Sequence, residues 1–220
     1  PAEHMAAVIW MHHQRYLALA HDPAVEMVLV FRNHGEQAGT SLIHPHSQIV
    51  ASSVVPSLLR DKLYQGQQYY DLYGRCVYCD IVAQEESLGE RMIVQNEHFV
   101  AIAPYASSVP YEIWLVPRRH RACFGMAEAD ELVDLAAVLQ HLLARLWRLL
   151  DDPDYNYIID TAPERMGAVP FYHWHLEIYP RLTTRAGFEI GTGIGINAQP
   201  PEQAAASLRE TDGSRIDVKE

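Results

Sequence analysis

Two histidines and a glutamine occupy alternate positions in the order His44-Pro45-His46-Ser47-Gln48. On an extended backbone alternate side chains point to the same face, so both imidazoles and the amide are predicted to project together. Such a pair of imidazoles also occurs in metal half-sites and by chance. The motif alone therefore leaves a nucleophile, a metal half-site and a coincidence open.

A glycine-containing turn precedes the histidines and holds Gly35, Gly39, Thr40 and Ser41. Glycine lets backbone N–H groups approach an anion without interference from a Cβ atom. A nucleophilic imidazole beside an anion-binding turn predicts phosphoryl or nucleotidyl transfer. Residues 31–48 are thus the segment that the other elements must position.

Hydrophobic patterns predict an α+β chain around this segment. We expect helices at residues 2–20, 56–72, 128–150 and 201–210, and strands at 27–31, 44–52, 92–94, 99–103, 111–116, 155–159 and 172–179. The helix at 128–150 has the clearest apolar stripe, with acidic residues in its first turns and arginines in its last. Between Arg181 and the helix at 201–210 the chain is glycine-rich and is predicted to form a loop.

Composition limits the function classes. The chain has 220 residues, of which 49% are apolar, so it can bury a sizeable core. Its net charge of −11 argues against a nucleic-acid partner. We see no apolar run that could span a bilayer and no signal peptide, so we expect no membrane partner. Three cysteines with one CxxC pair are typical of a reducing compartment, which favours the cytoplasm.

The pattern of strand, loop and alternating polar residues occurs twice. It ends at His44, His46 and Gln48 in the first copy, and at His173, His175 and Glu177 in the second. A repeat of this size predicts a duplicated domain. We place the boundary after residue 72, with a first unit at 1–72 that includes a linker helix and a second unit at 73–220.

The spacing of six residues resembles that of the galactose-1-phosphate uridylyltransferase family, a member of the histidine-triad superfamily. These residues are Asn33, Gly39, Ser41, His44, His46 and Gln48. The resemblance implies a duplicated histidine-triad-like fold of antiparallel sheets flanked by helices. Moving Cys76 back by the interval between His46 and His175 gives a position before Pro1, so we expect the first copy to be truncated.

The resemblance also implies site residues. His46 would attack the α-phosphorus of a nucleotide sugar, and Gln48 would donate a hydrogen bond to the phosphoryl oxygens. Gly39, Thr40 and Ser41 would hold the phosphates, and Asn33 belongs to the nucleotide pocket. Histidine suits the nucleophile because its unperturbed pKa of about 6.5 leaves it neutral near pH 7.

A CxxC pair opens the second unit and predicts half of a structural zinc site. The alternatives are a redox pair or two buried thiols, but redox pairs open a helix in a thioredoxin-like context, which we do not recognise here. The family resemblance implies a tetrad of Cys76, Cys79, His120 and His173, with His44 as the first-unit counterpart of His173 at a second zinc.

The resemblance places hexose contacts in residues 187–193, at Phe188 and Gly191. The amino-acid sequence of this segment more closely resembles that of a branch of the family that includes ADP-glucose phosphorylases. We therefore expect UMP transfer from UDP-glucose to galactose 1-phosphate, with adenylyl transfer from ADP-glucose as the alternative. A zinc-stabilised nucleotide-binding protein without turnover is the second alternative, and a homodimer is the expected assembly.

Overall fold

The computed structural model describes residues 2–40 and 44–214, which form seven strands and eight helical segments. The strands are β1 (Met27–His34), β2 (Gln48–Ser52), β3 (Met92–Gln95), β4 (Phe99–Ile102), β5 (Ile113–Pro117), β6 (Tyr155–Asp160) and β7 (His175–Pro180). The α-helices are α1 (Ala2–Ala20), α2 (Ser57–Tyr73), α3 (Val77–Leu88), α4 (Ala129–Leu150), α5 (Gly187–Thr192) and α6 (Pro201–Glu210). Short 3-10 turns lie at Phe124–Met126 and Glu164–Met166.

All seven strands join one antiparallel sheet in the order β2-β1-β6-β7-β5-β4-β3. The expected α+β fold with antiparallel pairing is confirmed. The strands of the two units are continuous in this sheet, because β1 pairs directly with β6. Val30 lies opposite Ile159 and Asn33 opposite Asn156, so a strand of the first unit extends the sheet of the second.

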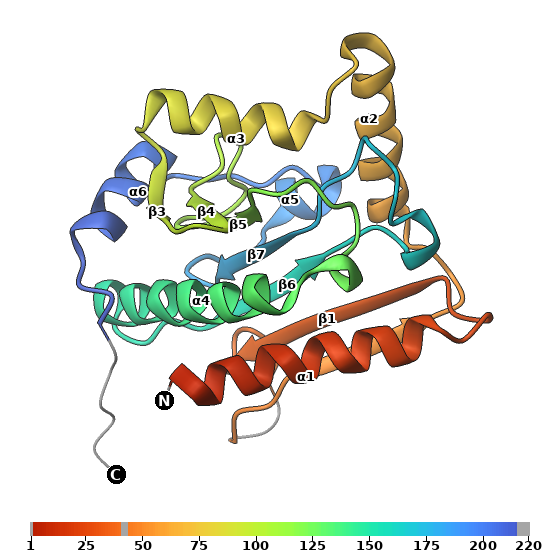
Figure 1. Cartoon of the computed structure of the whole chain (residues 1–220). Helices are drawn as coiled ribbons and strands as arrows, with labels where there is room; N and C mark the ends of the chain where they lie inside the picture. Colours follow the sequence, from red (N-terminus) through yellow and green to blue (C-terminus); the bar gives the residue numbers. More distant parts are fainter. Residues whose placement is uncertain (1, 41–43, 215–220) are drawn as a thin grey trace.

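The sheet separates two layers of helices (Figure 1). Helices α1 and α4 run across one face, and α2 and α3 lie over the other. Strand residues alternate between these layers, as a period of two requires. Val28, Val30, Ile159, Leu176 and Leu115 belong to the main core with α1 and α4.

Helix α4 follows its sequence pattern closely. Leu132, Leu135, Leu139 and Leu142 are almost completely buried. The backbone N–H of Glu128 donates to the side chain of Glu131 at 2.8 Å, which satisfies one donor that the helix start leaves open. The predicted apolar stripe is therefore confirmed, and it belongs to the main core together with residues of the sheet.

Helix α2 connects the His46 segment to the second unit. Leu59 and Leu63 are buried against Tyr78, Ala162 and Tyr172 in a second hydrophobic cluster. The helix spans the boundary that we place after residue 72, and that division stays a prediction. Among the residues that the structure describes, no helix is both long and apolar enough to cross a lipid bilayer.

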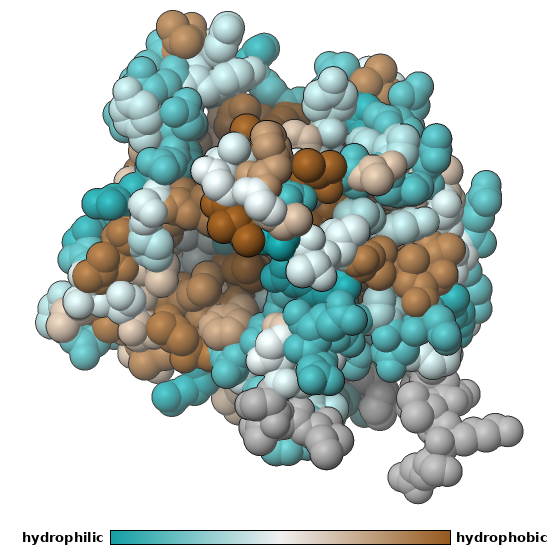
Figure 2. Space-filling model, turned by 180° about the vertical axis from the view of Figure 1, so that it is seen from behind, coloured by the Kyte–Doolittle hydropathy of each residue, from teal (hydrophilic) through white to brown (hydrophobic). Residues whose placement is uncertain are grey.

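Seen from behind, hydrophobic residues gather around a hollow on the side turned away from the viewer in Figure 1 (Figure 2). Large apolar side chains are exposed after β2 and in the C-terminal part of the chain, at Val54, Phe188, Ile190, Ile194 and Ile196. The expected homodimer stays a prediction.

Candidate functional site

The two histidines of the first motif precede a strand instead of lying in it. Strand β2 begins at Gln48, so the expected strand at 44–52 is wrong in its first half. Pro45 explains the difference, because proline has no N–H to donate to a β-ladder. His44 is exposed and His46 is half-buried.

A local hydrogen bond orients the ring of His46. Its Nδ1 lies 3.1 Å from the carbonyl oxygen of His44. A carbonyl only accepts hydrogen bonds, so Nδ1 must carry the proton, and the lone pair lies on Nε2. In the second motif Nδ1 of His175 lies 3.0 Å from the carbonyl oxygen of His173. The same contact in both motifs supports the internal repeat, and in the first motif it places the lone pair of the His46 ring on Nε2.

The glycine turn is closed by its own backbone. Gly35 and Gly39 both have φ of 85°, the left-handed region that favours glycine. The N–H of Gly39 donates to the carbonyl of Glu36 at 2.9 Å, and that of Thr40 to Gly35 at 3.2 Å. These two N–H groups are therefore engaged within the turn. The predicted phosphate contact Ser41 lies outside the described residues.

Asp154, the residue just before β6, holds this turn in place. The N–H of Gln37 donates to Oδ2 of Asp154 at 2.5 Å. A Cβ atom at Gly35 would lie 1.7 Å from Oδ1 of the same aspartate, so only glycine fits there. The second unit thus supports the turn of the first.

A row of side-chain amides connects Gln48 to the second unit. Nδ2 of Asn33 donates to Oε1 of Gln48 at 3.3 Å. Nδ2 of Asn156 donates both to Oδ1 of Asn33 at 2.7 Å and to the carbonyl of Ala38 at 2.9 Å. Nε of Arg181 donates to Oδ1 of Asn156 at 2.5 Å. Sequence reasoning found Asn33 and Gln48 but missed Asn156 and Arg181, which only the pairing of β1 with β6 brings to the site.

The predicted zinc tetrad comes together. Cys76, Cys79, His120 and His173 each place one potential ligand atom within 4.8 Å of the others. Sγ of Cys79 lies 3.2 Å from Nδ1 of His120 and 3.5 Å from Nδ1 of His173. Around a tetrahedral zinc, sulfur and nitrogen ligands would be about 3.5 Å apart. The donor set and its spacing fit zinc.

The pKa shifts within the tetrad point in both directions, and a hydrogen bond with Cys76 raises the pKa of His120. A hydrogen bond from Cys79 lowers the pKa of Cys76 and favours its thiolate, whereas the same contact raises the pKa of Cys79. Burial lowers the pKa of His173, which favours the neutral ring that a metal binds. His44 is in neither cluster of possible metal ligands found among the described residues.

The CxxC pair opens helix α3, with Cys76 at its N-cap. The expectation that this pair does not open a helix is therefore wrong. The zinc interpretation rests instead on the two histidines beside the thiols. All three cysteines are free, and Cys123 is buried.

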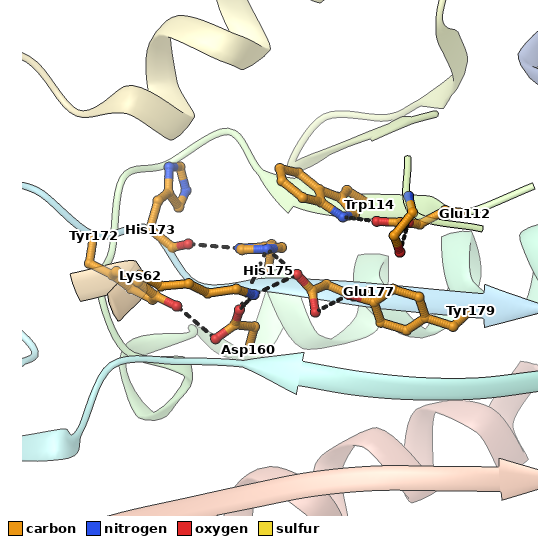
Figure 3. Close-up of polar contacts among 10 residues, drawn as sticks. Lys62, Glu112, Trp114, Asp160, Tyr172, His173, His175, Glu177 and Tyr179 are labelled. Carbon is orange, nitrogen blue, oxygen red and sulfur yellow. Dashed lines mark hydrogen bonds and ion pairs between the residues drawn. The ribbon is translucent and has the colours of Figure 1, made fainter. Parts of the chain in front are cut away.

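A buried charged cluster fills the space beside the second motif (Figure 3). Nζ of Lys62 contacts a carboxylate oxygen of Asp160 and lies 2.9 Å from Oε1 of Glu177. Nε2 of His175 lies 3.1 Å from the same Glu177 oxygen, and the hydroxyl of Tyr172 donates to Asp160 at 2.7 Å. His175, the counterpart of His46, is fully buried. Its Nε2 is engaged, so the second motif offers no free nucleophile.

The electrostatics of this cluster agree with its contacts. Burial acts to lower the pKa of Lys62, but the carboxylates of Asp160 and Glu177 outweigh it and raise that pKa. Burial likewise opposes the charged form of His175, yet its bond to Glu177 raises the pKa of the ring. Lys62 had no signal in the sequence, since it is one of many polar residues on α2, and only Leu59, Leu63 and Gly66 of that helix are buried.

The segment predicted to contact hexose is a short helix, α5, and not a loop. Phe188 is exposed. A hollow of about 370 Å³ is lined by Arg181, Arg185, Glu189 and other residues, and one of about 420 Å³ includes His46 and Arg32. Neither Phe188 nor Gly191 lines these hollows in the part of the chain that the structure describes. Hexose binding by these two residues stays a prediction.

Comparison with known proteins identifies the class. The N-terminal domain model of galactose-1-phosphate uridyl transferase matches residues 1–56, and the C-terminal domain model matches residues 61–217. The chain belongs to the galactose-1-phosphate uridyl transferase family. The expected resemblance is confirmed.

The relatives that match this chain carry two different names. A protein named ADP-glucose phosphorylase from Arabidopsis thaliana is 35% identical over 205 residues, which cover 92% of this chain and 57% of that protein. A galactose-1-phosphate uridylyltransferase from Thermotoga maritima is 30% identical over 220 residues, 96% of this chain and 69% of that protein. The chain thus spans little more than half of the Arabidopsis relative.

Solved structures agree with these matches. The crystal structure of an ADP-glucose phosphorylase from Arabidopsis thaliana with bound ADP-glucose has a TM-score of 0.87 and 34% identity, covering 94% of this chain and 66% of that one. A structure described as uridylyltransferase has a TM-score of 0.89 and 30% identity, covering 95% and 68%.

Proposed function

We propose that the protein is a nucleotidyltransferase that moves a nucleoside monophosphate from a nucleotide sugar to a phosphate or sugar 1-phosphate acceptor. The observation that carries this proposal is the hydrogen bond from Nδ1 of His46 to the carbonyl of His44. It leaves the Nε2 lone pair free, as a nucleophile requires.

The reaction takes place in two displacements. Nε2 of His46 forms a bond to the α-phosphorus while the bond from that phosphorus to the bridging oxygen breaks, which releases sugar 1-phosphate. An oxygen of the acceptor phosphate then attacks the same phosphorus, and the P–N bond breaks. Gln48 donates a hydrogen bond to the phosphoryl oxygens, where charge develops in the transition state.

Gln48 also favours transfer over hydrolysis. A glutamine side chain has no proton that it can release near neutral pH, so it cannot act as a general acid. A sugar phosphate leaves as an anion and needs no such acid. The finer assignment that we propose is UMP transfer from UDP-glucose to galactose 1-phosphate.

A second candidate is adenylyl transfer from ADP-glucose to phosphate. It is favoured by the 35% identity to the relative named ADP-glucose phosphorylase, against 30% for the uridylyltransferase from Thermotoga maritima. The two candidates use the same His46 chemistry and differ in base and acceptor.

Zinc would be held by Cys76, Cys79, His120 and His173, where it would stabilise the second unit as a structural ion. This tetrad joins the helix start at α3 to the loop after β5 and the segment before β7. Zinc contributes no step to the transfer.

Labelling of the protein tests the proposal. UDP-glucose or ADP-glucose, radiolabelled at the α-phosphorus, is incubated with the protein in the absence of acceptor. We expect label on the protein in a bond that is labile to acid and stable to base, as for phosphorus on an imidazole. His46→Gly should abolish labelling, and the exposed-histidine control His21→Gly should retain it.

The acceptor then separates the candidates. Release of label by galactose 1-phosphate after UDP-glucose supports the uridylyl assignment, and release by inorganic phosphate after ADP-glucose supports the adenylyl one. Binding of both nucleotide sugars without any labelling would identify a nucleotide-binding protein without turnover.

A further inference from the structure

The amide row beside Gln48 has chemically fixed ends. At one end the carbonyl of Ala38 can only accept a hydrogen bond, and at the other Nε of Arg181 can only donate one. Asn156 lies between them and is 7% exposed. Its Nδ2 faces Ala38 at 2.9 Å, and its Oδ1 faces Arg181 at 2.5 Å. A reversed amide would place oxygen against oxygen and N–H against N–H, so only one orientation satisfies both partners.

The orientation of the Asn156 amide determines the orientation of Asn33 and, through it, that of Gln48. Nδ2 of Asn156 gives its second proton to Oδ1 of Asn33 at 2.7 Å. Asn33 must therefore turn its own Nδ2 toward Gln48, where it donates to Oε1 at 3.3 Å. Gln48 accepts with its oxygen, and its Nε2 is left to donate outward.

We infer that Asn156 and Arg181 are positioning residues that fix the donor polarity of Gln48. A glutamine amide is nearly symmetric in shape, so packing alone would not choose between presenting N–H and presenting oxygen. Only N–H stabilises a phosphoryl oxygen in the transition state, since an outward oxygen would repel it. The row thus determines whether Gln48 assists the transfer. This inference rests on the proposed function.

The amide row also connects the two units, because residues of both contribute to it. Asn33 and Gln48 lie on β1 and β2, whereas Asn156 lies on β6 and Arg181 follows β7. Asn33 and Asn156 are direct partners in the β1–β6 register. The second unit, whose own motif is closed by Lys62 and Glu177, acts on the reaction through this contact.

Asn156→Asp tests the inference with almost no change of shape, although it also replaces the hydrogen bond to the carbonyl of Ala38 with a contact between two acceptors. The new carboxylate accepts from Arg181 but cannot donate, so Asn33 is expected to turn its Nδ2 toward that carboxylate. Gln48 then donates to Asn33 and presents its oxygen to the substrate. We expect the rate of histidine labelling to fall by about a hundredfold, as for Gln48→Ala, with KM for the nucleotide sugar little changed.

A double-mutant cycle distinguishes polarity from a general structural effect. In the Gln48→Ala background there is no amide left to invert, so adding Asn156→Asp should cost no further rate. Asn33→Asp gives the same inversion while it keeps the bond from Asn156. The matched control Asn96→Asp, at the far edge of the sheet, should leave the rate unchanged because the Asn96 side chain only accepts there.

The result that overturns the inference is a normal rate in Asn156→Asp and Asn33→Asp, or losses that multiply in the double variant. Neutron diffraction of deuterated crystals decides the same question without turnover. Nε2 of Gln48 should face outward in the native protein and inward in Asn156→Asp. A missing histidine label with the expected amide orientation would refute the proposed function alone, whereas an outward oxygen in the native protein would refute the inference.

Discussion

Lys62→Met should destabilise the protein through charge and not through volume. Methionine keeps most of the aliphatic stem of lysine but removes the ammonium from Asp160 and Glu177. Both carboxylates are almost completely buried. Their mutual repulsion would then be opposed only by His175 and by hydrogen bonds from the hydroxyl groups of Tyr172 and Tyr179.

The structure gives the size of the effect. Removing one partner of a buried ion pair costs about 3–5 kcal/mol, because it leaves the other charge uncompensated. The Lys62 side chain is 25% exposed, so water screens it in part and the lower end applies, about 3 kcal/mol. With a urea slope of about 3 kcal/mol per molar for a chain of this size, the unfolding midpoint should fall by roughly 1 M.

Urea unfolding at pH 7 measures this change by tryptophan fluorescence, since the ring of Trp114 lies 4.9 Å from that of His175. The surface control Arg119→Met breaks an exposed pair with Glu128 and should cost less than about 1 kcal/mol. Adding Glu177→Gln to Lys62→Met should restore part of the loss. A shift in Lys62→Met no larger than that of the control would refute the reasoning.

Further predictions concern the metal, pH and packing. Cys76→Ser should abolish bound zinc in elemental analysis and lower the melting temperature. A chelator should lower the melting temperature of the native protein by the same amount. Equal melting temperatures of the native protein with and without chelator would contradict this. Burial, with a smaller contribution from Arg32, lowers the pKa of His12 to about 4. Between these pH values His12 binds a proton in the unfolded chain but not in the folded one. The free energy of unfolding should therefore fall by about 1.4 kcal/mol per pH unit as the pH is lowered from about 6.5 to 4. His12→Gln should flatten this dependence in urea titrations. Gly66→Ala should destabilise α2 by about 1–3 kcal/mol despite the better helix propensity of alanine, because the added Cβ would lie 2.6 Å from the carbonyl oxygen of Phe171; a gain in melting temperature would contradict that contact.

Periodic elements were predictable because their signals are local. Leucines of α4 repeat at helical spacing, and strands at the core alternate or are wholly apolar, so their positions follow from the residues themselves. Helix α3 was not predicted because only two of its buried residues, Tyr78 and Val82, are apolar, which is too few for a clear helical period. Helix α5 was missed because Gly187 and Gly191 disfavour a helix in isolation.

The candidate site was predictable only where one segment carries it. His46 and Gln48 are two residues apart, and their spacing is informative. Asn156 and Arg181 are ordinary polar residues in the sequence, and Lys62 lies on an exposed-looking helix. The contacts that give Asn156 and Lys62 their roles join residues 98 to 123 positions apart, which no local pattern records.

The continuous sheet has a consequence for dissection of the molecule. Cutting the chain in α2 would separate β1 from β6 and leave each as an open edge, with unpaired N–H and C=O groups beside apolar residues such as Val30 and Ile159. Open edges of this kind are templates for pairing with other chains. Isolated halves are therefore expected to aggregate unless they are co-expressed, and split-protein complementation across this seam should succeed where excision of a single half fails.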